Sequence, residues 1–145
     1  MQHTDSAAPM TVAEEEGIYA FGQASDMIQF GPNAQLTAII DDWGPYYVER
    51  VNALMDKNWE SQDTWGGMDT GMVKIADIST DVPKVVVNLV NDAKAGIISG
   101  DLHPFTGPIN KQDGSVWLAE GETASDGDLL SMAFYVEGID GVVPN

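Results

Sequence analysis

The sequence predicts an α/β protein in which helices pack on a mostly parallel sheet. Short apolar segments alternate with helical patterns along the chain, which is the order typical of parallel sheets. Residues 35–41 form an apolar run of the kind found in buried parallel strands. Residues 45–57 carry apolar side chains at helical spacing, at positions 47, 51, 54 and 55. The length, 145 residues, fits one globular domain.

Start and stop signals place the elements before this long strand. Ser6 or Asp5 can cap a helix over residues 6–16, and Gly17 is a typical residue to end it. Residues 18–22 then form a short apolar strand. The chain turns before entering the strand at residues 35–41.

The middle of the chain predicts a loop, a strand and a second long helix. Residues 59–71 are rich in glycine and short polar side chains, which indicates a loop. Residues 72–76 are a strand candidate. A helix follows over residues 81–99, with Asp81 as its cap and Pro83 just inside it.

The tail after residue 100 differs in character. Two apolar segments, residues 105–109 and 116–119, flank an Asp-Gly pair at Asp113, which predicts a hairpin. Residues 126–136 then carry apolar side chains at helical spacing and are predicted as a short helix.

Composition excludes several classes of function. The chain has 23 Asp and Glu against 6 Lys and Arg, a formal net charge of −17, so we expect no binding to nucleic acid or to an anionic membrane surface. The acidic run at residues 14–16 is interpreted as a solvated helix face. No cysteine is present, so thiol chemistry, disulfides and cysteine-ligated metals are excluded within these residues.

The predicted core is small for an independent α/β domain. Residues 1–4 resemble the end of a strand with nothing before it to complete that strand. A sheet with two or three sizeable strands leaves a hydrophobic face and an open edge uncovered. We therefore expect the sequence to be the later part of a longer protein.

Candidate functional residues lie directly after the predicted strands. In open α/β sheets, ligands bind in the crevice outside the carboxyl ends of the strands. Three segments at such positions hold short hydrogen-bonding side chains, and one of them adds an aromatic ring. The candidates are His3, Thr4 and Asp5 in the first segment, Ser25 and Asp26 in the second, and Asp41, Asp42 and Trp43 in the third.

These residue types also have a purely structural interpretation. Asp, Ser and Thr are favoured as helix caps and turn formers whatever the function, and a lone His3 is commonly structural. Asp41 and Asp42 are harder to explain in this way, because adjacent carboxylates repel one another unless a donor or solvent compensates. Both interpretations therefore stay open for this pair.

Known catalytic and metal-binding patterns are missing. No glycine-rich nucleotide-binding motif and no nucleophile elbow occurs, and the two histidines, His3 and His103, are far apart in the sequence. The acidic residues between Asp63 and Asp69 lack the spacing of a calcium loop. We expect a protein without catalysis, cofactor or metal.

Eight short segments occur in order along nearly the whole chain. They are Met1-Gln2-His3-Thr4-Asp5-Ser6, Gly17-Ile18-Tyr19-Ala20-Phe21-Gly22, Leu36-Thr37-Ala38, Asp42-Trp43-Gly44-Pro45-Tyr46-Tyr47, Thr64-Trp65-Gly66-Gly67, His103-Pro104-Phe105-Thr106-Gly107-Pro108-Ile109, Gln112-Asp113-Gly114 and Tyr135-Val136-Glu137-Gly138. As a set they resemble the basic membrane protein family, which comprises substrate-binding proteins of bacterial ABC importers and is similar to purine nucleoside receptor lipoproteins.

The resemblance implies a type I periplasmic binding protein about twice this long, with two Rossmann-like three-layer lobes that close over a ligand at a hinge. This chain would be its C-terminal part, truncated at the N-terminus. Residues 1–41 and about 72–145 would belong mainly to the second lobe. The helix within about residues 42–60 would belong to the first lobe, most of which would precede this chain.

The family resemblance also implies partners and a location. The ligand would be a small molecule, with a purine base or nucleoside expected, and the permease subunits of the transporter would be protein partners. The full-length protein would be periplasmic or membrane-anchored outside the cytoplasm, with its signal peptide and lipid-bearing cysteine upstream of this chain.

Two positions depart from the pattern of nucleoside-binding relatives. Where those proteins show Gly-Val-Asp-Ser-Asp, this chain has Ala24 in place of the first carboxylate. Where they carry a lysine at the crossing between lobes, this chain has Asp41. The resemblance thus implies that Asp41 accepts a hydrogen bond from an amine or a protonated ring of a purine, while a ribose is less well provided for.

Two rival interpretations remain from the sequence. A small flavodoxin-like enzyme or response module would need a complete sheet and a phosphate or catalytic site within these residues. A non-functional gene fragment would keep the family's sequence without binding. The coding sequence upstream would separate a fragment from an importer component.

Overall fold

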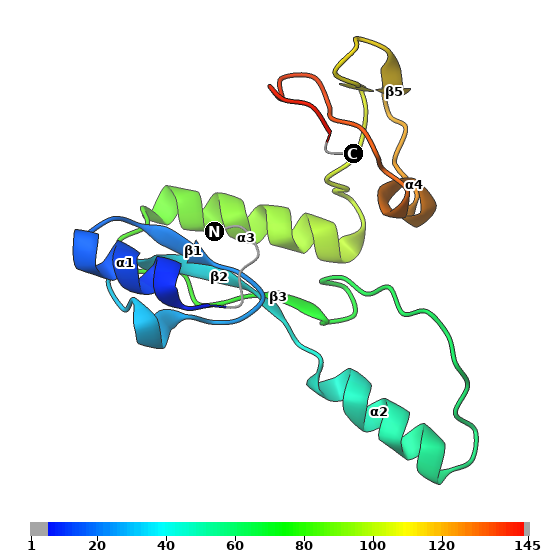
Figure 1. The fold of residues 1–145 in the computed structure, drawn as a ribbon, viewed down its shortest axis with the longest axis horizontal. Coiled ribbons are helices and arrows are strands. Elements are labelled where there is room, and N and C mark those ends of the chain that lie inside the picture. The colour runs from blue at the N-terminus through cyan, green and yellow to red at the C-terminus, as the bar shows by residue number, and fades with distance from the viewer. Residues whose placement is uncertain (1–5, 144–145) are drawn as a thin grey trace. The chain divides into compact units, whose positions relative to one another are not determined.

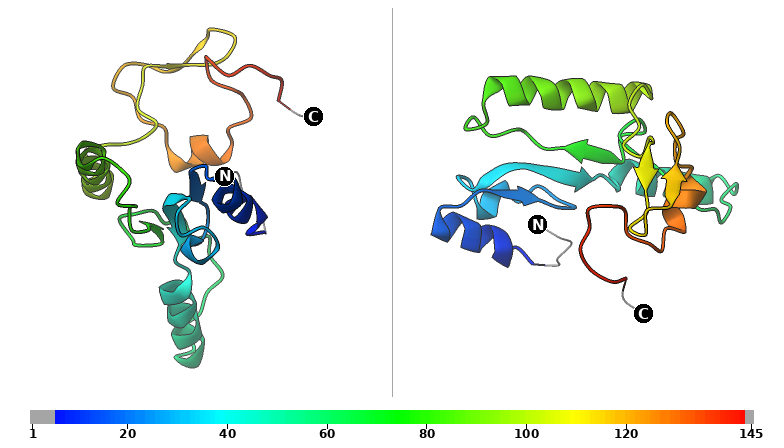
Figure 2. Two further views of the ribbon diagram at one scale, coloured as in Figure 1. Left: turned by 90° about the vertical axis from the view of Figure 1, so that its left-hand side faces the viewer. Right: turned by 90° about the horizontal axis from the view of Figure 1, so that it is seen from above.

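The structure of the protein, a computed structural model, describes residues 6–143 and divides into two compact units after Ile98 (Figure 1). The first unit is built on a three-stranded sheet with the strand order β1-β2-β3. Helices α1 and α3 lie on opposite sides of this sheet (Figure 2). These elements are β1 (Ala20–Gly22), β2 (Gln35–Asp41), β3 (Val73–Ile75), α1 (Ala8–Glu16) and α3 (Lys84–Ser99).

Helix α1 ends as predicted and begins two residues late. Gly17 adopts the left-handed conformation with φ of 65° that a helix stop requires. The N-cap residue is Ala7 and not Ser6 or Asp5 as predicted; Asp5 lies outside the described residues. Ser6 still contributes, because its hydroxyl oxygen accepts from the Ala8 amide at 3.1 Å.

The connection from β1 to β2 contains a single turn of 3-10 helix, η1 (Ile28–Phe30). Met10 and Ala13 of α1 pack with Met27 and Ala34 to form the core beneath it. Glu14, predicted as solvated, instead accepts from the Asn33 and Ala34 amides at 2.9 and 2.8 Å. Hydrogen bonding, chiefly from the Asn33 side chain, lowers the pKa of Glu14.

The third strand differs from the parallel prediction. β1 and β2 are parallel, with Phe21 paired to Thr37, but β3 runs antiparallel to β2, with Lys74 paired to Ile40. The reason is the route of the chain, which leaves β2 into helix α2 (Gly44–Met55), passes through the predicted loop and returns beside the strand it left.

Helix α3 also begins later than predicted. Asp81 and Pro83 lie before it, since the Pro83 carbonyl accepts from the Val86 and Val87 amides of its first turn. The Asp81 carboxylate is 3.4 Å from the Tyr19 hydroxyl, which donates to it. Gly100, with φ of 81°, follows the helix.

The second unit contains the predicted hairpin and a helix shorter than predicted. Trp117 of the hairpin contacts Phe105 and Phe134 edge to face. The predicted helix over residues 126–136 ends at Leu130, and Val136 instead forms an antiparallel bridge with Lys111. The elements are β4 (Ile109–Asn110), β5 (Val116–Leu118) and α4 (Asp126–Leu130).

Helix α2 projects beyond the end of β2 and the start of β3, away from the other helices of its unit (Figure 1). Its predicted apolar face is present but uncovered, and no residue of the fully described α2 is buried. Leu54 and Met55 remain 66% and 74% exposed, with Tyr47 and Val51 beside them. Such a contiguous apolar surface normally marks an interface.

One ion pair joins the strands where α2 leaves the sheet. The Lys74 ammonium of β3 donates to Asp42 Oδ2 at 2.5 Å, and the Gly44 amide donates to Oδ1 at 3.3 Å. The hydrogen bond from Lys74, followed by that from Gly44, lowers the pKa of Asp42. The pair therefore favours folding above the ordinary Asp pKa, and this contribution is lost as the pH falls through the lowered value.

We expect Lys74→Met to raise the pKa of Asp42 toward its ordinary value, because the substitution removes the largest cause of the shift. The pH dependence of the folding free energy that this ion pair contributes should then disappear. Carboxyl NMR titration of Asp42 measures the change. Lys84→Met, at an exposed position without an ion pair to another described residue, is the control. An Asp42 titration that is unchanged in Lys74→Met contradicts the assignment.

Candidate functional site

Two of the three predicted segments lie side by side at one end of the sheet. The segment after β1 contacts the end of β2, because the Asp41 amide donates to the Ala24 carbonyl at 3.1 Å. Ser25 and Asp26 follow Ala24 in the chain, so the second segment adjoins the third at this end, as the carboxyl-end rule predicts. The side-chain hydrogen bonds of Asp26 go instead to Ile28 and Gln35. His3, Thr4 and Asp5 lie outside the described residues, so their place in the site stays a prediction.

The segment after β1 has an unusual backbone. Ala24 adopts a left-handed conformation with φ of 65°, which few residues other than glycine adopt without strain. The adjoining Ser25 is exposed, and its hydroxyl has no hydrogen bond to another described residue. The segment thus turns Ser25 outward while its backbone is tied to β2.

Asp26 uses one carboxylate oxygen to order this segment. Its Oδ1 accepts from the Ile28 amide at 3.0 Å and from the Gln35 side chain at 2.7 Å. Its Oδ2 has no partner among the described residues. Asp26 is therefore a turn residue, as the structural interpretation held. Its Oδ2 is in addition a hydrogen-bond acceptor without a partner among the described residues.

Gln35 was missed by the sequence reasoning. It begins β2, is 2% exposed, and is the polar side chain buried most deeply among the described residues. Besides donating to Asp26, its Oε1 accepts from the Met27 amide at 3.0 Å. A polar residue at the start of an otherwise apolar strand is the one signal that would have pointed to it.

Asp41 and Asp42 differ in their surroundings. Asp42 is half-buried and bound to Lys74, which supplies the compensating donor that adjacent carboxylates require. Asp41 is exposed, and its carboxylate has no partner among the described residues. Asp42 therefore fits a structural role, and Asp41 is the carboxylate of the pair that is free to meet a ligand.

Trp43 precedes the first turn of α2 and belongs to an aromatic cluster. Its ring contacts Tyr46 edge to face at 5.7 Å and Tyr47 at 6.2 Å, measured between ring centroids. It is nevertheless 45% exposed. One face of a flat apolar ring next to two carboxylates can stack on a planar ligand.

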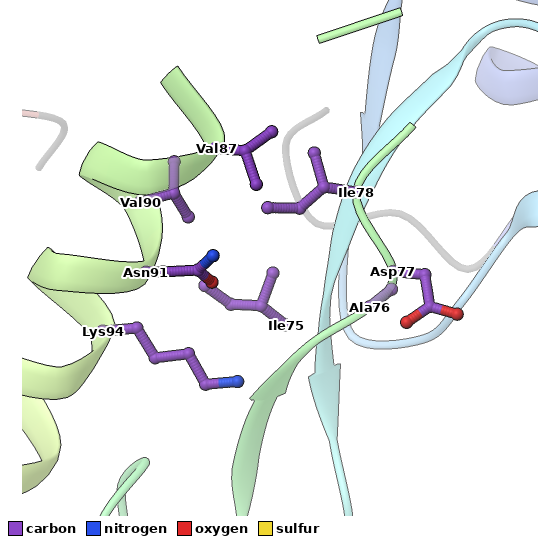
Figure 3. A pocket seen from close by; sticks show the side chains of 8 residues that line it. All are labelled: Ile75, Ala76, Asp77, Ile78, Val87, Val90, Asn91 and Lys94. Carbon is purple, nitrogen blue, oxygen red and sulfur yellow. The ribbon is translucent and has the colours of Figure 1, made fainter. Parts of the chain in front are cut away.

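We also searched the described residues for a metal site, a membrane-spanning helix and pockets. They contain no group of three or more side chains that could hold a metal ion, and no helix long and apolar enough to cross a membrane. A pocket of about 500 Å³ lies between β3 and α3 (Figure 3). It is lined by five aliphatic side chains together with Asp77, Asn91 and Lys94, and it contains none of the predicted residues.

Comparisons with known proteins agree with the resemblance. Residues 1–102 match the family of PnrA-like ABC transporter substrate-binding proteins. A purine-binding protein of Brucella abortus (strain 2308) is 55% identical over 143 residues, which is 99% of this chain and 41% of that protein. A protein of Haloferax volcanii that carries the name of an ABC transporter glucose-binding protein is 27% identical over 144 residues, 99% of this chain and 34% of its own length.

A solved structure shares the fold. The crystal structure of a transcriptional activator of the comK gene from Bacillus halodurans superposes with a TM-score of 0.60 at 21% identity, over 68% of this chain and 35% of that one. The chain spans less than half the length of both curated relatives. Since the family match covers well over half of the chain, the protein belongs to the PnrA-like family of ABC transporter substrate-binding proteins.

Proposed function

We propose that the chain is the C-terminal part of a solute-binding component of an ABC importer, and that the whole protein binds a purine base or nucleoside between two lobes. The observation that carries this proposal is the 55% identity, along 99% of the chain, to a protein named for purine binding. Because the chain spans 41% of that relative, the activity of the whole protein is inferred.

The described residues supply part of a purine site. Asp41 and the free oxygen of Asp26 accept hydrogen bonds, the Ser25 hydroxyl donates or accepts one, and Trp43 offers an exposed ring face for stacking. Purines present ring and exocyclic N–H donors in one plane, which suits acceptors placed beside an aromatic wall. His3, Thr4 and Asp5 complete the proposed set from the preceding segment.

The uncovered face of α2 fits a two-lobe arrangement. We assign residues 1–41 and about 72–145 mainly to the second lobe and the α2 helix to the first. A groove of about 400 Å³ on α2 is lined by Tyr47, Arg50, Val51, Leu54 and Trp59 and is almost wholly apolar. Aromatic, arginine and leucine side chains of this kind commonly anchor an interface, so the first lobe is its proposed occupant.

The proposal needs binding and closure, without catalysis. Closure follows when the ligand has a higher affinity for the closed state than for the open state. The permease subunits of the importer are the proposed protein partners, and the full-length protein is placed outside the cytoplasm.

The first test is mass spectrometry of small molecules released by denaturing the complete protein after gentle purification. Recovery of adenine or another purine supports the proposal. Recovery of a sugar keeps the transport class and agrees with the glucose-binding name of the Haloferax relative, but overturns the purine assignment. An export signal encoded upstream supports an importer component, whereas its absence favours a non-functional fragment.

Asp41→Ala in the complete protein should weaken purine binding at least about tenfold, or about 1.4 kcal/mol, because it removes a hydrogen-bond acceptor that ligand binding desolvates. Isothermal titration calorimetry measures the loss. Asp92→Ala, which removes an exposed carboxylate from α3, is the matched control and should bind normally. Equal affinities for Asp41→Ala and the control would contradict the assignment of Asp41 as a ligand-binding residue.

Leu54→Ala tests the packing of α2. If the first lobe covers this face, the substitution should lower the free energy of unfolding of the complete protein by about 2–5 kcal/mol, as at other buried leucines. If the face stays open, the effect should be below about 0.5 kcal/mol. Chemical denaturation separates the two cases. Asn52→Ala, on another side of the same helix, controls for helix propensity.

A further inference from the structure

We infer that Gln35 is a positioning residue for the ligand site: it holds the segment after β1 so that Asp26 presents its free oxygen to the ligand. The inference rests on the proposed function in one respect, since the ligand is taken to be a purine. The network itself is independent of the ligand and consists of three hydrogen bonds among described residues.

The network joins the start of β2 to residues 26 and 27, which lie beyond the paired residues of β1. Gln35 sits at the start of β2, paired in register with Ala20, whereas Asp26 and Met27 follow the end of β1. Both the oxygen and the nitrogen of the Gln35 side-chain amide form hydrogen bonds to this segment. Its oxygen accepts from Met27 and its nitrogen donates to Asp26.

Burial makes this contact costly to break. Gln35 is 2% exposed and Met27 is 7% exposed, so water cannot readily replace a lost partner there. A buried polar group that loses its hydrogen-bond partner destabilises the folded state. The segment is thus held firmly at its buried end while Ser25 and Asp26 remain at the surface.

Gly22 makes room for the glutamine. A Cβ atom at Gly22 would lie 2.6 Å from Ala38 Cβ and 2.9 Å from Gln35 Oε1. Distances this short do not occur between real atoms of these kinds. The space that the glycine leaves is therefore filled by the amide that orders the segment.

The two carboxylate oxygens of Asp26 have different roles in the network. Oδ1 takes both the Ile28 amide and the Gln35 amide, which fixes the plane of the carboxylate. Oδ2 is then presented at a set orientation without a partner among the described residues. A preorganised acceptor costs the ligand less ordering entropy than a mobile one.

Gln35→Glu in the complete protein tests the inference through pH. At about pH 8.5 the introduced carboxyl is ionised and repels Asp26, and at about pH 5 it is protonated, with the shape and the donor of the amide, because burial beside a carboxylate raises its pKa. We expect affinity for a purine panel of adenine, adenosine and guanosine to fall about tenfold at the higher pH and to recover at the lower one.

Amide exchange provides a readout that needs no ligand. The Ile28 amide donates to Asp26 Oδ1, so in Gln35→Glu it should exchange faster than in the unsubstituted protein at the same high pH, and equally fast at low pH. Gln29→Glu adds the same charge at an exposed position of η1 and should change neither measurement. A loss in Gln29→Glu equal to that in Gln35→Glu would overturn the inference.

Asp26→Asn keeps the inference testable if Gln35→Glu fails to fold. Its amide oxygen can still accept from Gln35 and Ile28, so Ile28 exchange should stay normal while purine affinity falls about tenfold. Normal affinity would overturn the role of Asp26 Oδ2.

Purine binding and Ile28 amide exchange distinguish a failure of the proposed function from a failure of this inference. If the unsubstituted protein binds no purine of the panel, the purine assignment fails. Faster Ile28 exchange in Gln35→Glu would then still support the positioning role. Unchanged exchange would overturn it.

Discussion

The central position of β2 constrains the rest of the first unit. A strand with neighbours on both edges must satisfy its backbone groups on both sides, and β2 does so with β1 in parallel and β3 in antiparallel orientation. At its end, the Asp41 amide reaches back to Ala24 and the Asp42 amide to the Met72 carbonyl. The candidate site therefore assembles where the last hydrogen bonds of this strand are made.

The same constraint explains why two adjacent carboxylates have different roles. Successive side chains of a strand point to opposite faces. Asp42 meets Lys74 from the neighbouring strand, and that pairing neutralises a charge next to the start of α2. Asp41 faces away from this cation and keeps its carboxylate for other partners. Asp42 thus joins β2 to β3 where α2 begins, and Asp41 stays available for the proposed ligand.

Local signals predicted more of the structure than nonlocal ones. The bounds of β2, the stop at Gly17 and the hairpin around Asp113 followed from patterns within a few residues. The antiparallel β3 and the contacts of Glu14 and Gln35 depend on segments about 9 to 39 residues apart, which no local pattern encodes. The site followed the same rule: topology predicted which segments meet, but not which atoms pair.

The charge of the candidate site also bears on the class of ligand. Asp26, Asp41 and Asp42 contribute three carboxylates, and Lys74 compensates one of them. A phosphorylated ligand would bring negative charge toward two uncompensated acceptors in a chain whose net charge is −17, which is unfavourable. A neutral or protonated heterocycle with N–H donors meets those acceptors without that repulsion. Within the proposed purine class, electrostatics therefore favours a free base or nucleoside over a nucleotide.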